Sequence, residues 1–401
     1  EHNIYGGGEM STVGRYWVKG INDNVTGAPT APSDLPDGMP YQQQSGGVCT
    51  VTVQGNAQIG PDAGASDEAG HVFGAGKGVN PSFTAGATKR MVNNADGGSL
   101  VVFADDATTG KTAETLYLEF LQTLALVTNT QVTINGGVVK GSVYGGSESG
   151  FVQTNTDVDI QNGTVSGDAY GGGLGLASFA EAGKVKGNTD IAVSGGAVLG
   201  NVYGGGRLGD VGIIDKTDKK DDGQLSYNYK WKKNDGTTAN DTEINTKTDL
   251  NTNTGICKVT ISGGTIGTSG TVSTEHGNVF GAGRGSDITW WCEKAIAYAT
   301  DVSVTGGAVN GNVYGGGQIG RVEDDAKVTI RVANATGAAA PTITGSVFGA
   351  GAGLHTHGYS ALVRGNSDVT VQGTAQVGGS VFGGGEIASV GKFTVVGGLP
   401  K

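Results

Sequence analysis

Aromatic side chains in one set of loops have the type and spacing expected of a binding surface. They follow Phe-Gly-Ala-Gly and related segments, together with the cations Lys77, Arg284 and Arg364. If successive loops emerge on one side, the rings form a ladder, and exposed aromatic rings stack on sugars or anchor proteins. The alternative is that the rings fold back as a lid on the protein. The candidate ligand-binding residues are Phe83, Phe179, Trp290, Trp291, Tyr298 and Tyr359.

A second aromatic group, Tyr227, Tyr229 and Trp231, alternates with Asn228 and Lys230 in a charged stretch. Alternation with a period of two indicates a strand, here one side of a projecting hairpin. Aromatic and basic side chains in this arrangement can grip a glycan or a peptide. A solvated arm without a ligand is the alternative interpretation.

Three aspartates, Asp190, Asp301 and Asp368, stand at the same position, immediately before an alternating apolar strand. Such carboxylates cap turns through backbone hydrogen bonds, and stacked carboxylates can also bridge calcium. Calcium is the only cofactor that the sequence suggests. His355 and His357 can share one face of a strand, but no third metal ligand accompanies them.

The three cysteines, Cys49, Cys257 and Cys292, are too few for a disulfide framework. Cys49 and Cys257 precede equivalent strands and are expected to be small apolar fillers, with a Cys257–Cys292 bridge as the alternative. No Ser–His–Asp arrangement or carboxylate pair stands out in so repetitive a chain. We therefore assign no catalytic residue, and the chain is not predicted to be an enzyme.

The elements that must position these side chains are defined by a repeat. Glycine accounts for 76 of the 401 residues, and much of it follows an aromatic residue that recurs nine times. The last four copies are 34 residues apart, and two types alternate, so the full unit is a pair of about 68 residues. The repeated aromatic residues are Tyr5, Phe73, Tyr144, Tyr170, Tyr203, Phe280, Tyr314, Phe348 and Phe382.

Each copy contains a strand in which apolar and small polar residues alternate, as in Val302–Val304 and Val369–Val371. A Gly-Gly or Gly-Thr turn follows, and then a short strand that ends at the repeated aromatic residue. Short strands recurring without a helix between them predict an all-β fold. The predicted architecture is a parallel β-helix-like β-solenoid of about nine coils of ~34 residues, in alternating pairs.

Three insertions interrupt the repeat within what we expect to be a single β-solenoid over residues 1–401. Residues 15–47 are rich in Pro, Gly, Asn and Gln and predict a surface loop. Residues 80–130 predict a loop plus one amphipathic helix at 112–126, which either packs on the flank of the fold or binds a partner. Residues 210–255 form the charged projecting arm.

Composition excludes some functions. The formal net charge is −11, so binding to nucleic acid, which requires a basic surface, is not expected. No apolar run approaches the ~18 residues of a membrane-spanning helix, so direct membrane insertion is not expected either. The chain begins and ends inside the repeat pattern. This predicts a fragment of a longer repeat protein or end-to-end self-association.

The Val-Tyr-Gly-Gly-Gly and Val-Phe-Gly-Ala-Gly repeats resemble those of glycine-rich bacterial cell-surface β-solenoid proteins of the adhesin or fibre type. The resemblance covers most of the chain outside the insertions and implies an extracellular location on the bacterial surface. It implies a rigid rod whose loops attach to glycans or to host or bacterial surface proteins. Two alternatives remain open: a carbohydrate-active β-helix enzyme (polysaccharide lyase or glycosidase) and a filament or matrix subunit without a receptor.

Overall fold

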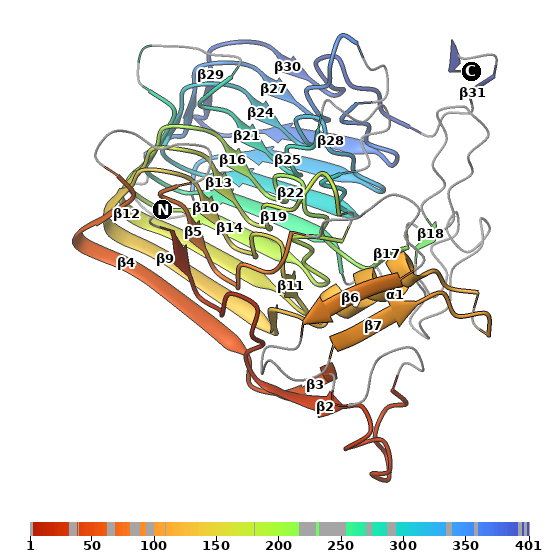
Figure 1. Ribbon diagram of the computed structural model, residues 1–401. Helices are drawn as coiled ribbons and strands as arrows, with labels where there is room; N and C mark the ends of the chain where they lie inside the picture. The colour runs from red at the N-terminus through yellow and green to blue at the C-terminus, as the bar shows by residue number, and fades with distance from the viewer. Residues whose placement is uncertain are drawn as a thin grey trace.

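The computed structural model is built almost entirely of strands, with a single helix among the residues it describes. The all-β prediction is confirmed, and most strands are parallel members of two long, curled sheets (Figure 1). The structure describes residues 3–31, 38, 40–61, 69–80, 89–93, 100–108, 110–179, 181–215, 230–231, 254–268, 270, 275–286, 294–333, 339–356, 360–391, 395–396 and 399–400.

One sheet consists of nine two-residue strands, each ending at a repeated aromatic residue. They pair in parallel and in order along the chain, so the aromatic residues stand in register from Tyr5 to Phe382. We number the layers of the fold 1 to 9 by these strands. They are β1 (Ile4–Tyr5), β5 (Val72–Phe73), β10 (Val143–Tyr144), β13 (Ala169–Tyr170), β16 (Val202–Tyr203), β21 (Val279–Phe280), β24 (Val313–Tyr314), β27 (Val347–Phe348) and β30 (Val381–Phe382).

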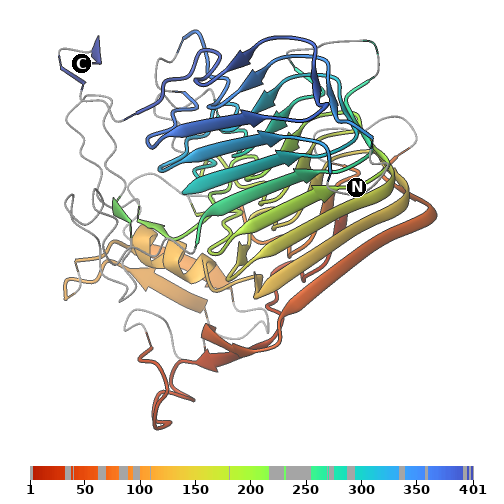
Figure 2. The same ribbon diagram turned by 180° about the vertical axis from the view of Figure 1, so that it is seen from behind.

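The other long sheet has thirteen strands and contains the alternating segments (Figure 2). Its long strands are β4 (Val48–Ile59), β9 (Asn129–Val139), β12 (Thr156–Val165), β14 (Thr189–Val193), β19 (Ile256–Ile261), β22 (Ala299–Val304), β25 (Ala326–Ile330) and β28 (Ser367–Val371). After β12 each layer adds a separate short strand: β15 (Ala197–Val198), β20 (Thr265–Ile266), β23 (Ala308–Val309), β26 (Thr342–Ile343) or β29 (Gln376–Val377).

Glycines make the predicted turns between the long and short strands. Gly196, Gly264 and Gly307 have φ angles of 68°, 71° and 75°, a region that side chains with a Cβ rarely adopt. Within the long strands, apolar and polar residues alternate, so the apolar side chains all point to the same, inner face of the sheet. Val158, Ile160 and the equivalent residues of layers 2 to 8 are buried in one continuous core.

A column of valines that the sequence analysis did not identify closes each layer. It includes β8 (Leu126–Val127) and β11 (Phe151–Val152), and it continues as single-residue parallel bridges such as Val185–Val211 and Val322–Val363. These contacts involve only one or two residues per layer, so they leave no alternating pattern in the sequence. Together with small residues such as Ala282 they form a second buried cluster.

The nine aromatic rings form one unbroken stack. Neighbouring ring centroids are 4.6–5.0 Å apart and neighbouring planes lie within 9° of parallel. This spacing equals the distance between paired strands, so the sheet imposes it on the rings. Burial also raises the pKa of Tyr144 to about 12, which keeps this hydroxyl group neutral.

Both described cysteines occupy one position of a buried threonine column. Cys49 pairs with Thr130 in the sheet, and Cys257 lies between Thr189 and Thr300. Both thiols are free and buried, which agrees with their expected role as small fillers and leaves Cys257 unbridged. Burial raises the pKa of Cys257 to about 12, partly offset by a hydrogen bond with Thr189.

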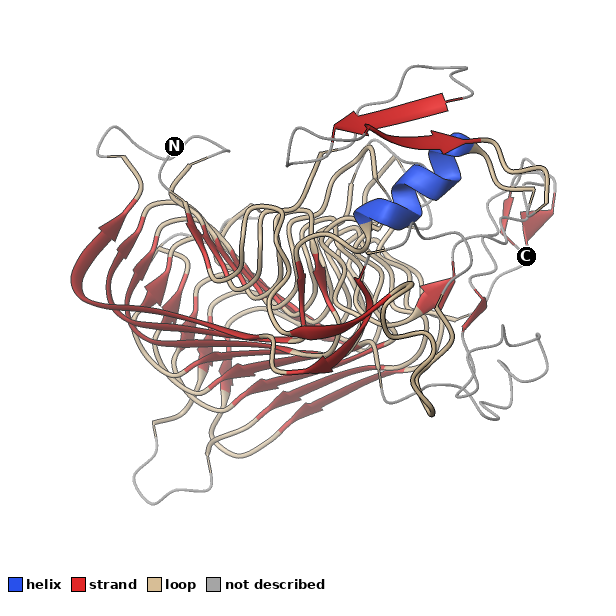
Figure 3. Ribbon diagram, turned by 60° about the horizontal axis from the view of Figure 1, so that its bottom comes forward, coloured by secondary structure: helices blue, strands red, loops and turns tan. Residues whose placement is uncertain are grey.

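The insertions add small elements at the periphery (Figure 3). Within 15–47, β2 (Arg15–Val18) and β3 (Pro40–Ser45) form an antiparallel pair where we expected only a loop.

The insertion at 80–130 contains the helix. Here β6 (Lys89–Asn93) pairs with β7 (Leu100–Ala104), and helix α1 (Ala113–Leu121) packs through Tyr117 and Phe120 in a cluster that includes Phe151. Two further pairs are β17 (Ile214–Asp215) with β18 (Lys230–Trp231), and β31 (Val395–Val396) with β32 (Leu399–Pro400).

Candidate functional site

The loop aromatics predicted to bind a ligand are buried wherever the structure describes their side chains. Phe179 is 3% exposed and packs in the cluster of helix α1, and Tyr298 is 5% exposed. Neither ring therefore presents a face to a ligand. Phe83, Trp290, Trp291, Tyr359, Tyr227 and Tyr229 lie outside the described residues, and Trp231 is described only as part of strand β18.

The three cations expected beside those aromatics are each engaged within the fold. Lys77 forms an ion pair with Glu9 at 3.3 Å, and the Arg284 guanidinium group lies close enough to Tyr170 and Tyr203 to interact with them electrostatically. Arg364 pairs with the buried Glu323 at 2.7 Å. All three cations thus interact with other groups of the chain itself.

The three aspartates considered as calcium ligands do not lie next to one another. In the sheet register Lys258 lies between Asp190 and Asp301, and Lys327 lies between Asp301 and Asp368. Lys258 forms an ion pair of 2.6 Å with Asp190. Lysine residues therefore occupy the register positions between these three carboxylates, and no two of the three aspartates pair directly.

Among the described residues, no group of three or more His, Cys, Asp or Glu side chains is placed to hold a metal ion. His355 is exposed, and His357 lies outside the described part of the chain. The same described part contains no helix long and apolar enough to cross a membrane.

An outward hollow of about 450 Å³ lies over the long strands of layers 3 to 6 and is lined by Asp157, Asp159, Asp190 and Lys258, among others. Partial burial and the neighbouring carboxylates of Asp190 and Asp159 raise the pKa of Asp157, while Lys258 opposes this shift. Carboxylates and an ammonium group along a flat sheet can hydrogen-bond a hydroxylated ligand. The charged groups of this hollow resemble those on the rest of the protein surface, so they do not by themselves mark a binding site.

The strongest candidate site is a polar cleft of about 430 Å³ beside the aromatic strands. Its lining includes Lys140, Ser166, Asp168 and His276, and His71 lies at its base. All of these side chains have hydrogen-bonding groups, so the cleft suits a neutral or weakly charged polyhydroxylated ligand.

The cleft runs along a polar ladder that the sequence analysis missed. The residue two positions before each of the first eight aromatic residues accepts a hydrogen bond from the backbone N–H of its counterpart in the next layer. His71 Nδ1 accepts from Ser142 N at 2.9 Å, and Asp168 Oδ1 accepts from Asn201 N at 2.8 Å. The signal was present in the sequence: this position is always a small polar residue or His. The ladder residues are Asn3, His71, Ser142, Asp168, Asn201, Asn278, Asn312, Ser346 and Ser380.

The ladder limits the chemistry of the cleft. Asp168 accepts from Asn201 N with one oxygen and from the Tyr170 hydroxyl group with the other, at 2.9 Å. His71 uses Nδ1 as an acceptor, so its proton is on Nε2. Both groups are held as parts of the backbone scaffold, and the cleft is suited to recognition more than to proton transfer.

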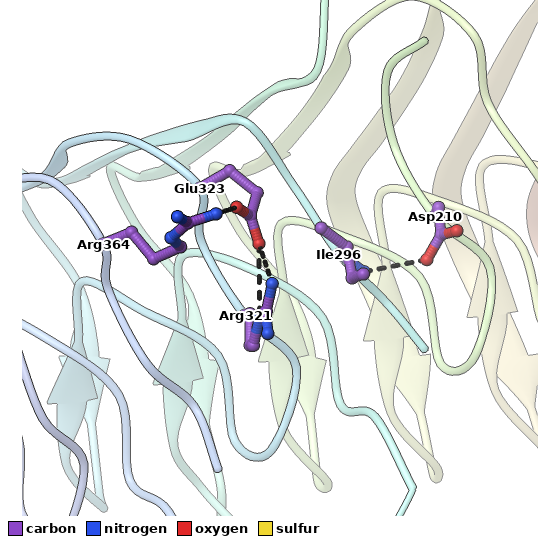
Figure 4. A network of polar contacts seen from close by, with 5 residues as sticks. All are labelled: Asp210, Ile296, Arg321, Glu323 and Arg364. Carbon is purple, nitrogen blue, oxygen red and sulfur yellow. Dashed lines mark hydrogen bonds and ion pairs between the residues drawn. The ribbon is translucent and has the colours of Figure 1, made fainter. Parts of the chain in front are cut away.

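A buried ionic cluster lies on another side of the stack (Figure 4). Glu323 is enclosed between Arg321 and Arg364 and hydrogen-bonds both. Burial alone would raise the pKa of Glu323, but the two guanidinium groups hold it below its ordinary value. In the same region Asp210 Oδ1 accepts from Ile296 N at 3.0 Å.

Comparisons with protein-family models, with curated proteins and with solved structures found no match for this chain.

Proposed function

We propose that the chain is a parallel β-helix-like β-solenoid of about nine coils of ~34 residues, arranged in alternating pairs. The parallel register of equivalent strands supports this, because residues one repeat apart pair directly, as Val313 does with Val347. Glycine recurs in the turns, valine in the column that closes the layers, and an aromatic residue at the end of each short strand, and this recurrence supports the solenoid as well.

We propose further that this solenoid is a structural or adhesive rod of a bacterial surface or an extracellular fibre. The observation that carries the proposal is the unbroken stack of nine aromatic rings at 4.6–5.0 Å. A stack of this kind resists bending and holds the outer surfaces at fixed positions. The resemblance of the Val-Tyr-Gly-Gly-Gly repeats to glycine-rich surface proteins supports the same function and location.

The proposed partner is a glycan or a surface protein that presents hydroxyl groups. The polar cleft around Lys140, Ser166 and His276 is the site best suited to such a partner in the described part of the chain. Its polar lining and its open shape along the rod support a chain-like ligand. End-to-end self-association is the second proposed mode of contact.

Two measurements test the function. Electron micrographs should show short straight rods, and a glycan array should give specific binding that Lys140→Ala weakens. Lys327→Ala, on the separate outward column of the long sheet, is the matched control and should bind as wild type does. A double variant, Trp290→Ala with Trp291→Ala, tests on the same array whether the loop aromatic residues contribute to glycan binding.

The competing functions predict different results. Reproducible cleavage of any member of a polysaccharide panel would contradict the adhesive proposal and favour a lyase or a glycosidase. Rods without binding to any glycan or surface protein would favour a filament or matrix subunit.

A further inference from the structure

One wall of the polar cleft is formed by the residues four positions before the repeated aromatic residues, which we call the wall column. In layers 3 to 6 the wall column consists of Lys140, Ser166, Leu199 and His276, and all four line the cleft. The two members that can carry a positive charge are therefore both in the cleft. In layers 2, 7, 8 and 9 the same column consists of Ala69, Asn310, Thr344 and Gly378.

The cleft is also lined by a column of glycine residues, because the residue three positions before the aromatic is glycine in layers 2 to 9. Gly167 N donates to Gly141 O at 2.9 Å, so the backbones of adjacent layers pair directly here. A Cβ atom on Gly141 would lie 2.6 Å from His71 Nδ1, and one on Gly167 would lie 2.6 Å from Ser142 Oγ. Glycine therefore keeps the space between the wall column and the polar ladder free of side chains.

On the ladder side of the cleft, hydrogen-bond acceptors are engaged by the fold. His71 Nδ1 accepts from a backbone N–H group. One oxygen of Asp168 accepts from Asn201 N and the other from the Tyr170 hydroxyl group. The Arg284 guanidinium group also interacts electrostatically with Asp168. The negative charge of Asp168 is thus offset within the protein.

On the wall side, Lys140 supplies a positive charge. Its side chain is partly exposed, and an ammonium group has three N–H donors and no acceptor. Hydrogen bonds from an ammonium group to a carboxylate are about twice as strong as those between neutral groups. The net charge of −11 does not prevent such binding, because charges more than ~10 Å away are largely screened at 0.1 M salt. The wall column therefore favours an anionic oxygen near Lys140.

The wall column changes its chemistry along the cleft. Leu199, two layers beyond Lys140, is 39% exposed and gives the cleft an apolar patch. At ~4.8 Å per layer, these two backbone positions are about 10 Å apart. His276 follows in the next layer, and its neighbour Glu275 is exposed as well. Because Glu275 would repel an anion, we expect the anionic group of a ligand at the Lys140 end.

On the basis of the glycan attachment proposed above, we infer that the cleft binds an acidic polysaccharide, a glycan chain that contains uronate residues. A uronate carboxylate pairs with the Lys140 ammonium group, sugar hydroxyl groups hydrogen-bond Ser166, and the C–H face of a sugar ring contacts Leu199. The wall from layer 3 to layer 6 spans three layer spacings, about 14 Å. This length suits several linked sugars better than a single one.

An acidic peptide fits the cleft less well than a glycan does. An extended peptide binds mainly by adding main-chain hydrogen bonds to an open sheet edge. Along the cleft the backbone is already paired, since Gly141 N donates to Gly70 O and Gly167 N to Gly141 O, both at 2.9 Å. Recognition in the cleft must therefore use side chains, which suits a ligand rich in hydroxyl groups.

The test uses pairs of oligosaccharides that differ only in charge. Fluorescently labelled hexamers of galacturonate, glucuronate and mannuronate are compared with their methyl esters, which keep the ring hydroxyl groups and lack the charge. Cellohexaose serves as a neutral glycan and hexaglutamate as an acidic peptide. Fluorescence anisotropy measures the dissociation constant of each probe with the full chain.

We expect at least one free acid to bind about tenfold more tightly than its ester, because only the acid forms a charge-assisted bond. High salt should reduce this preference. Lys140→Gln should abolish it and Lys140→Arg should retain it, while Leu199→Ser should weaken acid and ester alike. Lys327→Gln, on the long sheet, is the matched control and should bind as the wild type does. A melting curve of Lys140→Gln like that of the wild type verifies its fold.

Free acids that bind no better than their esters, or a preference that Lys140→Gln leaves unchanged, would overturn the inference and leave glycan attachment intact. Hexaglutamate that binds as tightly as the best free acid would also overturn it, because the cleft would then accept acidic chains of any kind. If no acid, ester or cellohexaose bound at all, glycan attachment at this cleft would itself be contradicted.

Discussion

At the scale of single residues, the fold contains buried polar groups that are hydrogen-bonded to specific partners. Glu323 accepts hydrogen bonds from Arg321 and Arg364, and Thr189 Oγ1 donates to Gly204 O at 2.6 Å. A buried polar group left without its partner costs far more than the pair contributes. Substitutions at these positions should therefore have large and specific effects.

The Glu323 cluster predicts a pH-dependent stability. The pKa of Glu323 is lowered in the folded protein, so its contribution is complete above the unfolded-state value of ~4.3 and is lost as pH falls through the folded pKa. Glu323→Gln should lower the free energy of unfolding by about 3–5 kcal/mol at pH 7 and by less at pH 3. Urea titrations at both pH values measure this.

The control for Glu323 is Asp190→Asn, which breaks an ion pair whose side chains are 38% and 52% exposed. An exposed pair of this kind contributes at most about 1 kcal/mol. If Asp190→Asn proved as costly as Glu323→Gln, burial would not be the reason for the effect.

The threonine column predicts a stabilising substitution. Thr130, Thr156, Thr189 and Thr300 each donate to a glycine carbonyl group at 2.6 Å, whereas Cys257 is a weak donor at the equivalent position. Cys257→Thr should therefore gain about 0.5–1.5 kcal/mol, measured as a higher urea midpoint. The reverse change, Thr189→Cys, should lower the midpoint, and a loss of stability in both variants would contradict the account.

At the scale of the elements, the glycine triplets allow adjacent turns to pack backbone against backbone. A Cβ atom on Gly316 would lie 2.6 Å from Gly351 N, with no flexible side chain to move away. The equivalent Gly384 of the last layer has no atom within 4 Å of such a Cβ. The same sequence position is thus constrained inside the stack and free at its end.

This contrast predicts different effects for two identical substitutions. Gly316→Ala should destabilise the protein by about 1–3 kcal/mol through overpacking. Gly384→Ala should change stability by about 0.5 kcal/mol or less. Thermal melts of the two variants compare them directly, and similar losses in both would show that close packing is not the cause.

At the scale of the whole molecule, each layer contacts mainly its neighbours, so stability should vary along the stack of layers. Strands β13 and β16 have partners on both sides, while β30 has one only on the side of β27. The interior apolar side chains of layer 9 are also exposed.

Hydrogen exchange should therefore be slowest in layers 4 and 5 and fastest in layer 9, because fraying starts where a layer lacks one neighbour. Mass spectrometry of peptides covering Tyr170, Tyr203 and Phe382 measures this order. Equal protection against hydrogen exchange in all nine layers would contradict this expectation, because the stack of layers would then unfold as one cooperative unit.

Much of this architecture could be read from local patterns. Repetition of the same aromatic–glycine segment defined the aromatic residues, and the alternation in segments such as Val302–Val304 defined which face is buried. These predictions succeeded because each depends on residues close together in the chain. Helix α1 was likewise visible from its amphipathic pattern, with observed bounds of Ala113–Leu121.

The sequence by itself determined the alternating long strands, the short strands that end at the repeated aromatic residues, and the turns between them, because period and turn chemistry are local properties. Only the tertiary structure decided which side chains meet across layers. It placed Lys258 and Lys327 between the aspartates, buried Phe179 and Tyr298, and joined the Tyr203 hydroxyl group to Gln318 two layers away. Such contacts join residues dozens of positions apart, and their register is set by the stacking of whole layers and by no local pattern.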